Sequence, residues 1–196
     1  MRLQTMVAVM VLSASSMMSG AQMKSMDMPT KTAGSMSPAK ALDEMLSAYE
    51  GEAMGVVKVM PADKYDFAPS AAIFAAGQTT KFDTVRTFGQ QVAHVAEANY
   101  YFYSTISGLK PDVDMKKIET MTKKDDAVAA LAGSFAFGHK AIATITAANA
   151  FMTIKGADGM HTRATLAAFA VAHGYDHYGQ WVECLRMNGL VPPGSK

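Results

Sequence analysis

The sequence predicts an all-α protein, an antiparallel four-helix bundle, within a chain of 196 residues. Four segments carry apolar residues at alternating spacings of three and four, the pattern of a helix with one buried face. No stretch shows the alternation of apolar and polar residues that is typical of a half-buried strand. The net charge is +1 and Lys and Arg do not cluster, which argues against nucleic acid as a partner.

The first 21 residues have the pattern of a signal peptide. A basic start at Arg2 precedes an apolar run over 6–18, and the small residues Ser19-Gly20-Ala21 suit signal peptidase. The apolar run is too short for a convincing transmembrane helix. We therefore expect cleavage after Ala21, a periplasmic or secreted protein and no membrane span in the mature chain. An uncleaved N-terminal anchor is the alternative.

Residues 22–36 are rich in Met, Ser, Thr and Lys and contain little that could pack, so a disordered, Met-rich tether is expected. Methionine thioethers can bind Cu(I). Because methionine is abundant throughout the chain, composition explains this cluster without copper.

A single domain is expected over residues 37–196, and Ser37-Pro38 predicts its first helix, with a hydroxyl cap and proline in the first turn. Apolar positions continue at helical spacing to Met60. Two prolines interrupt residues 60–70, and residues 71–81 are expected to be irregular with at most a short helical turn.

The second helix is predicted from Asp83 or Thr84 to Ser107, where Gly108 ends it. His94 lies one position beside its apolar stripe, close enough to the core to reach inward. Three polar neighbours on the same helix are candidates to hydrogen-bond a histidine there: Gln90, Gln91 and Glu97.

The third helix is predicted from about Asp125, after a polar connection over 111–124, with Thr122 and Asp125 spaced as a capping box. His139 lies on it without a second histidine, so we expect a half-exposed or locally bonded side chain. Residues 151–161 contain two glycines and are predicted to be a loop that carries His161.

The fourth helix is predicted to begin after Thr162 and to end within a residue or two of Gly189. His173 and His177 are one helical turn apart on its apolar face, so both imidazoles point inward and can aim at one point. Cys184 is on the same face, about 10 Å further along the helix, which favours a buried, inert thiol over a ligand of the same metal.

His94, His173 and His177 are therefore the candidate metal ligands. Three neutral imidazoles leave coordination positions open on a divalent ion, as in catalytic zinc sites. Inward histidines are also often hydrogen-bonded core residues, and the residues alone leave that alternative open.

The chain resembles the DinB-like (YfiT-type) superfamily in three stretches: TFGQQVAHVAEANYYFY, PADKYDFAPS and HGYDHYGQWVECLRMNGLVPP. The resemblance spans about residues 38–193. It implies a four-helix bundle with a three-histidine nickel or zinc site, whose ligands fall on His94, His173 and His177. Relatives include thiol S-transferases, in which the metal activates a thiolate.

Two functions remain open at this stage. One is an exported metalloenzyme, a hydrolase or thiol S-transferase acting on an unknown small molecule, with Glu97, Tyr175 and Asp176 as the nearest candidate bases. The other is a non-catalytic metal-binding or stress-related protein. The sequence contains neither the Glu-x-x-His pairs of a di-iron carboxylate site nor the Cys-x-x-Cys-His motif of covalent c-type haem. The sequence is compatible with a homodimer and leaves the metal, the substrate and the oligomeric state undecided.

Overall fold

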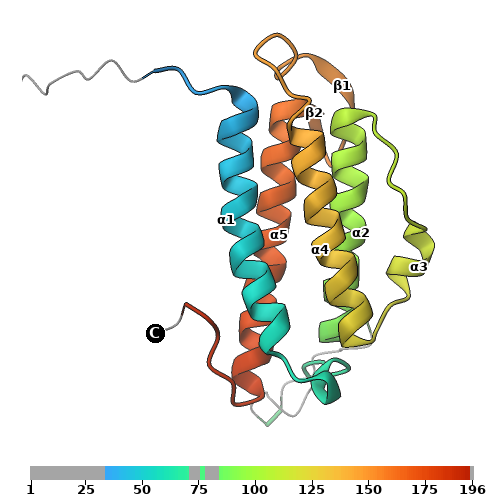
Figure 1. Ribbon diagram of the computed structural model, residues 1–196. Helices are drawn as coiled ribbons and strands as arrows, with labels where there is room; N and C mark the ends of the chain where they lie inside the picture. Colours follow the sequence, from blue (N-terminus) through green and yellow to red (C-terminus); the bar gives the residue numbers. More distant parts are fainter. Residues whose placement is uncertain (1–33, 71–75, 78–83, 195–196) are drawn as a thin grey trace, which may run out of the picture. The chain divides into compact units, whose positions relative to one another are not determined.

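A computed structural model describes residues 34–70, 76–77 and 84–194. The predictions for the signal peptide, for residues 22–33 of the tether and for most of residues 71–83 concern residues outside this part of the chain. The described part is mostly helical (Figure 1). Its elements are α1 (Pro38–Val59), the 3-10 turn η1 (Ala62–Lys64), α2 (Phe88–Ser107), α3 (Met115–Glu119), α4 (Lys124–Ile142), β1 (Thr153–Ala157), β2 (Met160–Thr162) and α5 (Arg163–Met187).

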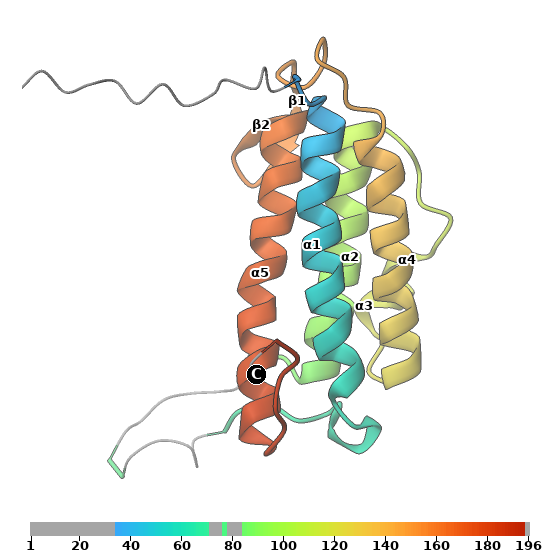
Figure 2. The ribbon, with the colours of Figure 1, turned by 60° about the vertical axis from the view of Figure 1, so that its left-hand side comes forward.

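The four long helices form the predicted bundle, in which α1 and α2 each pack against α4 and α5 (Figures 1 and 2). The neighbouring pairs α1/α4 and α2/α5 run antiparallel, as expected. The pairs α1/α5 and α2/α4 instead run parallel, because the connection over 108–123 returns along the length of the bundle before α4 begins (Figure 1). This order places α2 beside α5, the two helices that carry the candidate ligands.

Helix caps confirm the predicted ends of the first and last helices. Ser37 accepts a hydrogen bond from the Lys40 amide at the start of α1. Thr162 and Thr165 form a reciprocal capping box at the start of α5. The last helix ends at Met187, and Gly189 has a φ of 71°, a left-handed conformation that suits glycine.

The predicted start of the second helix was wrong by about four residues. Thr87 is the N-cap of α2, and it forms a capping box with Gln90, whose side chain accepts from the Thr87 amide. The apolar spacing includes Val85 and so predicts an earlier start. The two cap hydrogen bonds at Thr87 outweigh that pattern and set the start of the helix. Val85 is accordingly exposed and lies outside the helix.

The connection before α4 also differs from the prediction. It contains the short helix α3, whose N-cap Asp114 accepts from the Lys116 amide. The expected capping box of Thr122 and Asp125 does not form, because α4 begins at Lys124 with Lys123 as its N-cap. Thr122 is therefore one position too early to cap the helix.

Residues 151–161 were predicted to be a loop, and this was wrong. They contain a two-stranded antiparallel hairpin of β1 and β2, which contacts α2 and α5. Asp158 and Gly159 form its turn with φ values of 49° and 77°. Positive φ at both central residues is what a tight hairpin turn needs, and Asp-Gly is a strong sequence signal for it.

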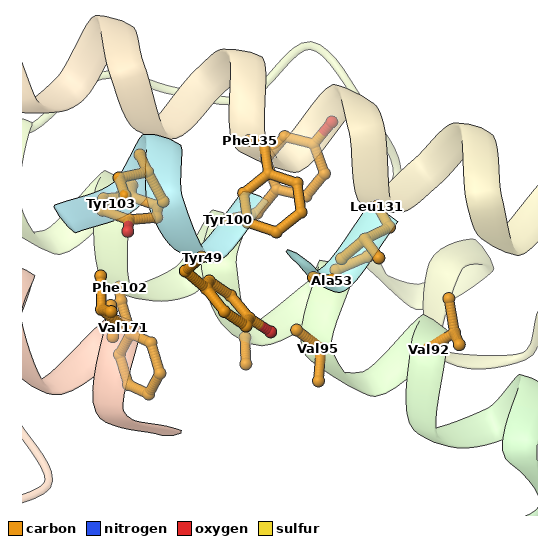
Figure 3. Packing of buried hydrophobic residues seen from close by; sticks show 14 of the residues in the cluster. Tyr49, Ala53, Val92, Val95, Tyr100, Phe102, Tyr103, Leu131, Phe135 and Val171 are labelled. Atoms are coloured by element: carbon orange, nitrogen blue, oxygen red, sulfur yellow. The ribbon is translucent and has the colours of Figure 1, made fainter. Parts of the chain in front are cut away.

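The bundle core is built from side chains of all four long helices (Figure 3). Tyr49 of α1 is fully buried and meets Phe135 of α4 edge-on, with ring centroids 5.4 Å apart. One polar contact crosses the core, where the Asn99 side-chain amide donates to the Ser134 hydroxyl at 3.0 Å. Among the described residues, no helix combines the length and apolar character that crossing a membrane requires.

Candidate metal centre

The structure brings together the three histidines that the sequence singled out. His94 comes from α2, and His173 and His177 come from successive turns of α5. One ring nitrogen from each lies within 4.8 Å of the other two. The ring centroids are 5.5 Å apart for His94 and His173, 5.1 Å for His94 and His177, and 4.8 Å for His173 and His177.

Two of these histidines have ring nitrogens without a partner. The Nδ1 atoms of His173 and His177 are buried and form no hydrogen bond within the described part of the chain. His177 is 8% exposed, and His173 is half-buried. A buried polar atom left without a partner costs about 1–3 kcal/mol, so these nitrogens do not behave like satisfied core histidines.

The surroundings keep the imidazoles neutral. Burial lowers the pKa of His94 to about 4, and the charges of Arg86 and His173 add to the shift. Burial likewise lowers the pKa of His177 to about 4, with His173 and His94 contributing. The pKa of His173 is also lowered, again chiefly by burial. At neutral pH all three rings are therefore in the form that binds metal ions.

The donor set fits a divalent transition metal. Imidazole nitrogen is a good ligand for zinc and nickel, and no carboxylate or thiol belongs to this cluster of three, the one such cluster among the described residues. Around tetrahedral zinc, ligand nitrogens lie about 3.4 Å apart, so binding requires the rings to close by about 1 Å. Side-chain torsions can supply a shift of that size.

Charged side chains lie near the cluster, among them Asp176, which influences His173 and His177. Glu97 Oε2 lies 3.9 Å from His94 Nδ1. Arg86 is close enough to influence all three histidines, and Asp158, in the hairpin turn, influences His173. Neither Arg86 nor Asp158 was among the residues that the sequence predicted to lie near the histidines. The Asp-Gly turn was a signal for the hairpin, but no local pattern marked Arg86.

The other predicted neighbours have different roles. Gln90 caps α2, whereas Gln91 is buried with an unpartnered Oε1 atom. Tyr175 packs against Tyr49 of α1 with tilted rings, their centroids 5.0 Å apart, and Asp176 accepts a hydrogen bond from Gln180. Of the three candidate bases, Glu97 is thus the one in contact with a cluster histidine.

The remaining histidines and the cysteine are separate from the cluster. His139 is part-buried between two carboxylates of α1: its Nδ1 lies 2.5 Å from Asp43 and its Nε2 lies 2.9 Å from Glu50. These partners are distant in sequence rather than local. His161 is exposed on β2. Cys184 is buried as predicted, and burial raises the pKa of its thiol to about 11.

The profile of the DinB superfamily matches residues 45–181, a range that includes all three histidines. The chain belongs to the DinB superfamily. Among solved structures, a DinB-like protein from Bacillus cereus ATCC 10987 is similar to this DinB-superfamily chain with a TM-score of 0.65. The two share 14% sequence identity, and the match covers 79% of this chain and 95% of that chain. At this identity the likeness concerns the fold. No curated protein matches the sequence.

Proposed function

We propose that this DinB-superfamily protein binds one divalent metal ion, zinc or nickel, through His94, His173 and His177, and that the centre acts on a small-molecule substrate. The observation that carries the proposal is the convergence of three neutral imidazoles, two of which have buried ring nitrogens without partners. A metal would give one ring nitrogen of each histidine a partner.

The composition of the site favours a reactive centre over a closed structural one. Three protein ligands leave positions for substrate, whereas structural zinc sites have four. His94 and His173 are only partly buried, so a small molecule could reach them. A divalent ion in such a site supplies Lewis acidity for a hydrolase, or stabilises a thiolate in an S-transferase.

Two charged side chains would assist the histidines. Glu97 Oε2 lies 3.9 Å from Nδ1 of His94, which favours Nε2 as the ligand atom. Arg86 adds positive charge beside the cluster and would favour substrates that carry or develop negative charge at the reacting end.

A non-catalytic metal-binding role is the alternative. It is favoured by the engagement of Tyr175 with Tyr49 and of Asp176 with Gln180, which leaves Glu97 as the one remaining candidate base. Turnover of ester, amide, phosphoester or thiol-transfer substrates by the metal-loaded protein, above a metal-free control, would separate the two roles.

Elemental analysis of the purified protein tests the metal proposal directly. Wild type is expected to carry one zinc or nickel ion per chain. His173→Ala should bind it at least about a hundredfold more weakly, because a full ligand set contributes roughly 10–16 kcal/mol. His161→Ala is the matched control, since His161 is exposed and lies apart from the cluster. Equal metal content in wild type and His173→Ala would refute the proposal.

We also propose that the protein is exported, on the basis of the apolar run over 6–18 and the small residues that end at Ala21. Intact mass of protein recovered from the cell envelope or the medium tests this. A mature chain that begins at Gln22 is expected, and one that still begins at Met1 would contradict the proposal.

A further inference from the structure

An open surface cavity of about 350 Å³, most of whose lining residues are exposed, lies beside α5 at the start of α2. Its walls are largely apolar, with Pro69 and Val85 from the segment between α1 and α2, and Met187 from the end of α5. Gly179 contributes no side chain, and a Cβ atom built there would meet nothing within 4 Å. The cavity is thus large enough for a ring-sized group.

None of the three histidines lines the cavity, but two of its lining residues are close to them along the helices. Gln91, which lines it, precedes His94 by three residues on α2, and Asp176 directly precedes His177 on α5. Residues three apart on a helix are separated by about 4.5 Å along the axis. A small molecule that reaches the histidines could therefore extend into the cavity.

The charges around the cavity are acidic. Asp176 and Glu183 line it, and no basic side chain is among its described lining residues. Glu183 is paired with Arg186, whereas Asp176 accepts a hydrogen bond from the neutral amide of Gln180. An anionic group in the cavity would be repelled, because a second negative charge would lie close to Asp176.

We propose that this cavity is the substrate subsite of the three-histidine centre, and that it receives an uncharged, apolar body. This inference rests on the proposed metal-binding function and adds a substrate class to it. Molecules whose body carries a carboxylate or phosphate are disfavoured by Asp176 and Glu183.

The test uses the full chain loaded with cobalt, with thiols as probes. A thiol that loses its proton and binds cobalt produces a sulfur-to-metal charge-transfer band, which is titrated to obtain a dissociation constant. We compare 2-phenylethanethiol, which has an apolar body, with 3-mercaptopropionate, which is anionic, and 2-mercaptoethanol, which has almost no body. Wild type should bind 2-phenylethanethiol more tightly than either of the others.

Gly179→Leu fills the cavity from an open position and leaves all three histidines in place. It should weaken 2-phenylethanethiol binding at least about tenfold by removing its apolar contacts, and change 2-mercaptoethanol binding less than about twofold. Gly51→Leu is the matched control, because Gly51 is exposed on α1 with nothing within 4 Å of its Cβ position. It should behave like wild type.

The outcomes distinguish the two proposals. Failure of the chain to bind cobalt would overturn the metal-binding function itself. Cobalt binding with equal affinities for 2-phenylethanethiol in Gly179→Leu and wild type would overturn the subsite alone. The subsite would also be overturned by tighter binding of 3-mercaptopropionate than of 2-phenylethanethiol, or by the absence of a charge-transfer band with every thiol.

Discussion

Gly174→Ala is expected to destabilise the bundle next to the candidate metal centre. Gly174 is buried on α5, directly after His173, where the ring of Tyr49 from α1 packs against the helix backbone. A Cβ atom at this position would lie 2.6 Å from the Tyr49 hydroxyl oxygen, and closer still to Cε1 and Cζ. Carbon atoms in contact are normally about 3.5–4.0 Å apart, so the ring or the helix must move by more than 1 Å.

The surroundings of Tyr49 set the size of the effect. Its ring is fully buried and packs beside Phe135 (Figure 3). The ring centroids of Phe135 and Tyr175 lie 5.4 Å and 5.0 Å from that of Tyr49. Overpacking at such a site costs typically 1–3 kcal/mol, and the upper end applies because the new Cβ would clash with ring carbons of the fully buried Tyr49. Replacing glycine by alanine in a helix returns about 1 kcal/mol. The net loss in the free energy of unfolding should be about 2 kcal/mol.

Urea unfolding followed by circular dichroism on metal-free protein measures this loss. Gly179→Ala is the control on the same helix, because its Cβ would meet nothing within 4 Å. That variant should gain about 1 kcal/mol from helix propensity alone. The same chemical change, five residues apart, is therefore expected to have opposite signs.

A double-mutant cycle identifies the ring as the cause. In a Tyr49→Leu background the atoms nearest to the new Cβ are gone, so Gly174→Ala should there be neutral or stabilising. Wild-type stability in Gly174→Ala would refute the packing argument. An equal loss in the presence and absence of the Tyr49 ring would also refute it.

Two further predictions concern pH. The pKa values of His94 and His177 are lowered from 6.5 to about 4 in the folded state. Metal-free protein should therefore lose stability as the pH falls from about 6.5 towards 4. His177→Gln should reduce this loss in urea titrations. His139 should act in the opposite sense. Burial lowers its pKa, but hydrogen bonds to Asp43 and Glu50 outweigh burial and raise it. The stabilisation of the folded protein by His139 is therefore complete below pH 6.5 and is lost as the pH rises above that value. His139→Gln should remove this alkaline loss, and an unchanged pH profile would show that the ion pairs contribute nothing.

The sequence predicted the helices best where a local signal was complete. Ser37-Pro38 and Thr162 start helices and Gly189 ends one, as expected, because caps depend on residues within one turn. The hairpin was missed although Asp158-Gly159 is itself a local signal. Its strands, five and three residues long, are too short to show a clear alternating pattern.

Local pattern also identified two of the three histidines of the candidate site. His173 and His177 are four residues apart on one helix, so their proximity follows from helical geometry alone. His94 was a candidate because it lies beside an apolar stripe, and the resemblance to the superfamily supported its place in the cluster. Periodicity placed His94 on a flank of its helix, and it could not say which helix that flank would meet.

The sequence by itself determined the helical class, most helix ends and the paired histidines of α5. The tertiary structure decided that α2 lies beside α5, which brings His94 to the pair, and that His139 lies against Asp43 and Glu50, 96 and 89 residues away. The physical reason is the range of the interactions. Caps and helical spacing act within one or two turns, whereas the meeting of helix faces depends on how the long connections route the chain and on the side chains of all four helices together.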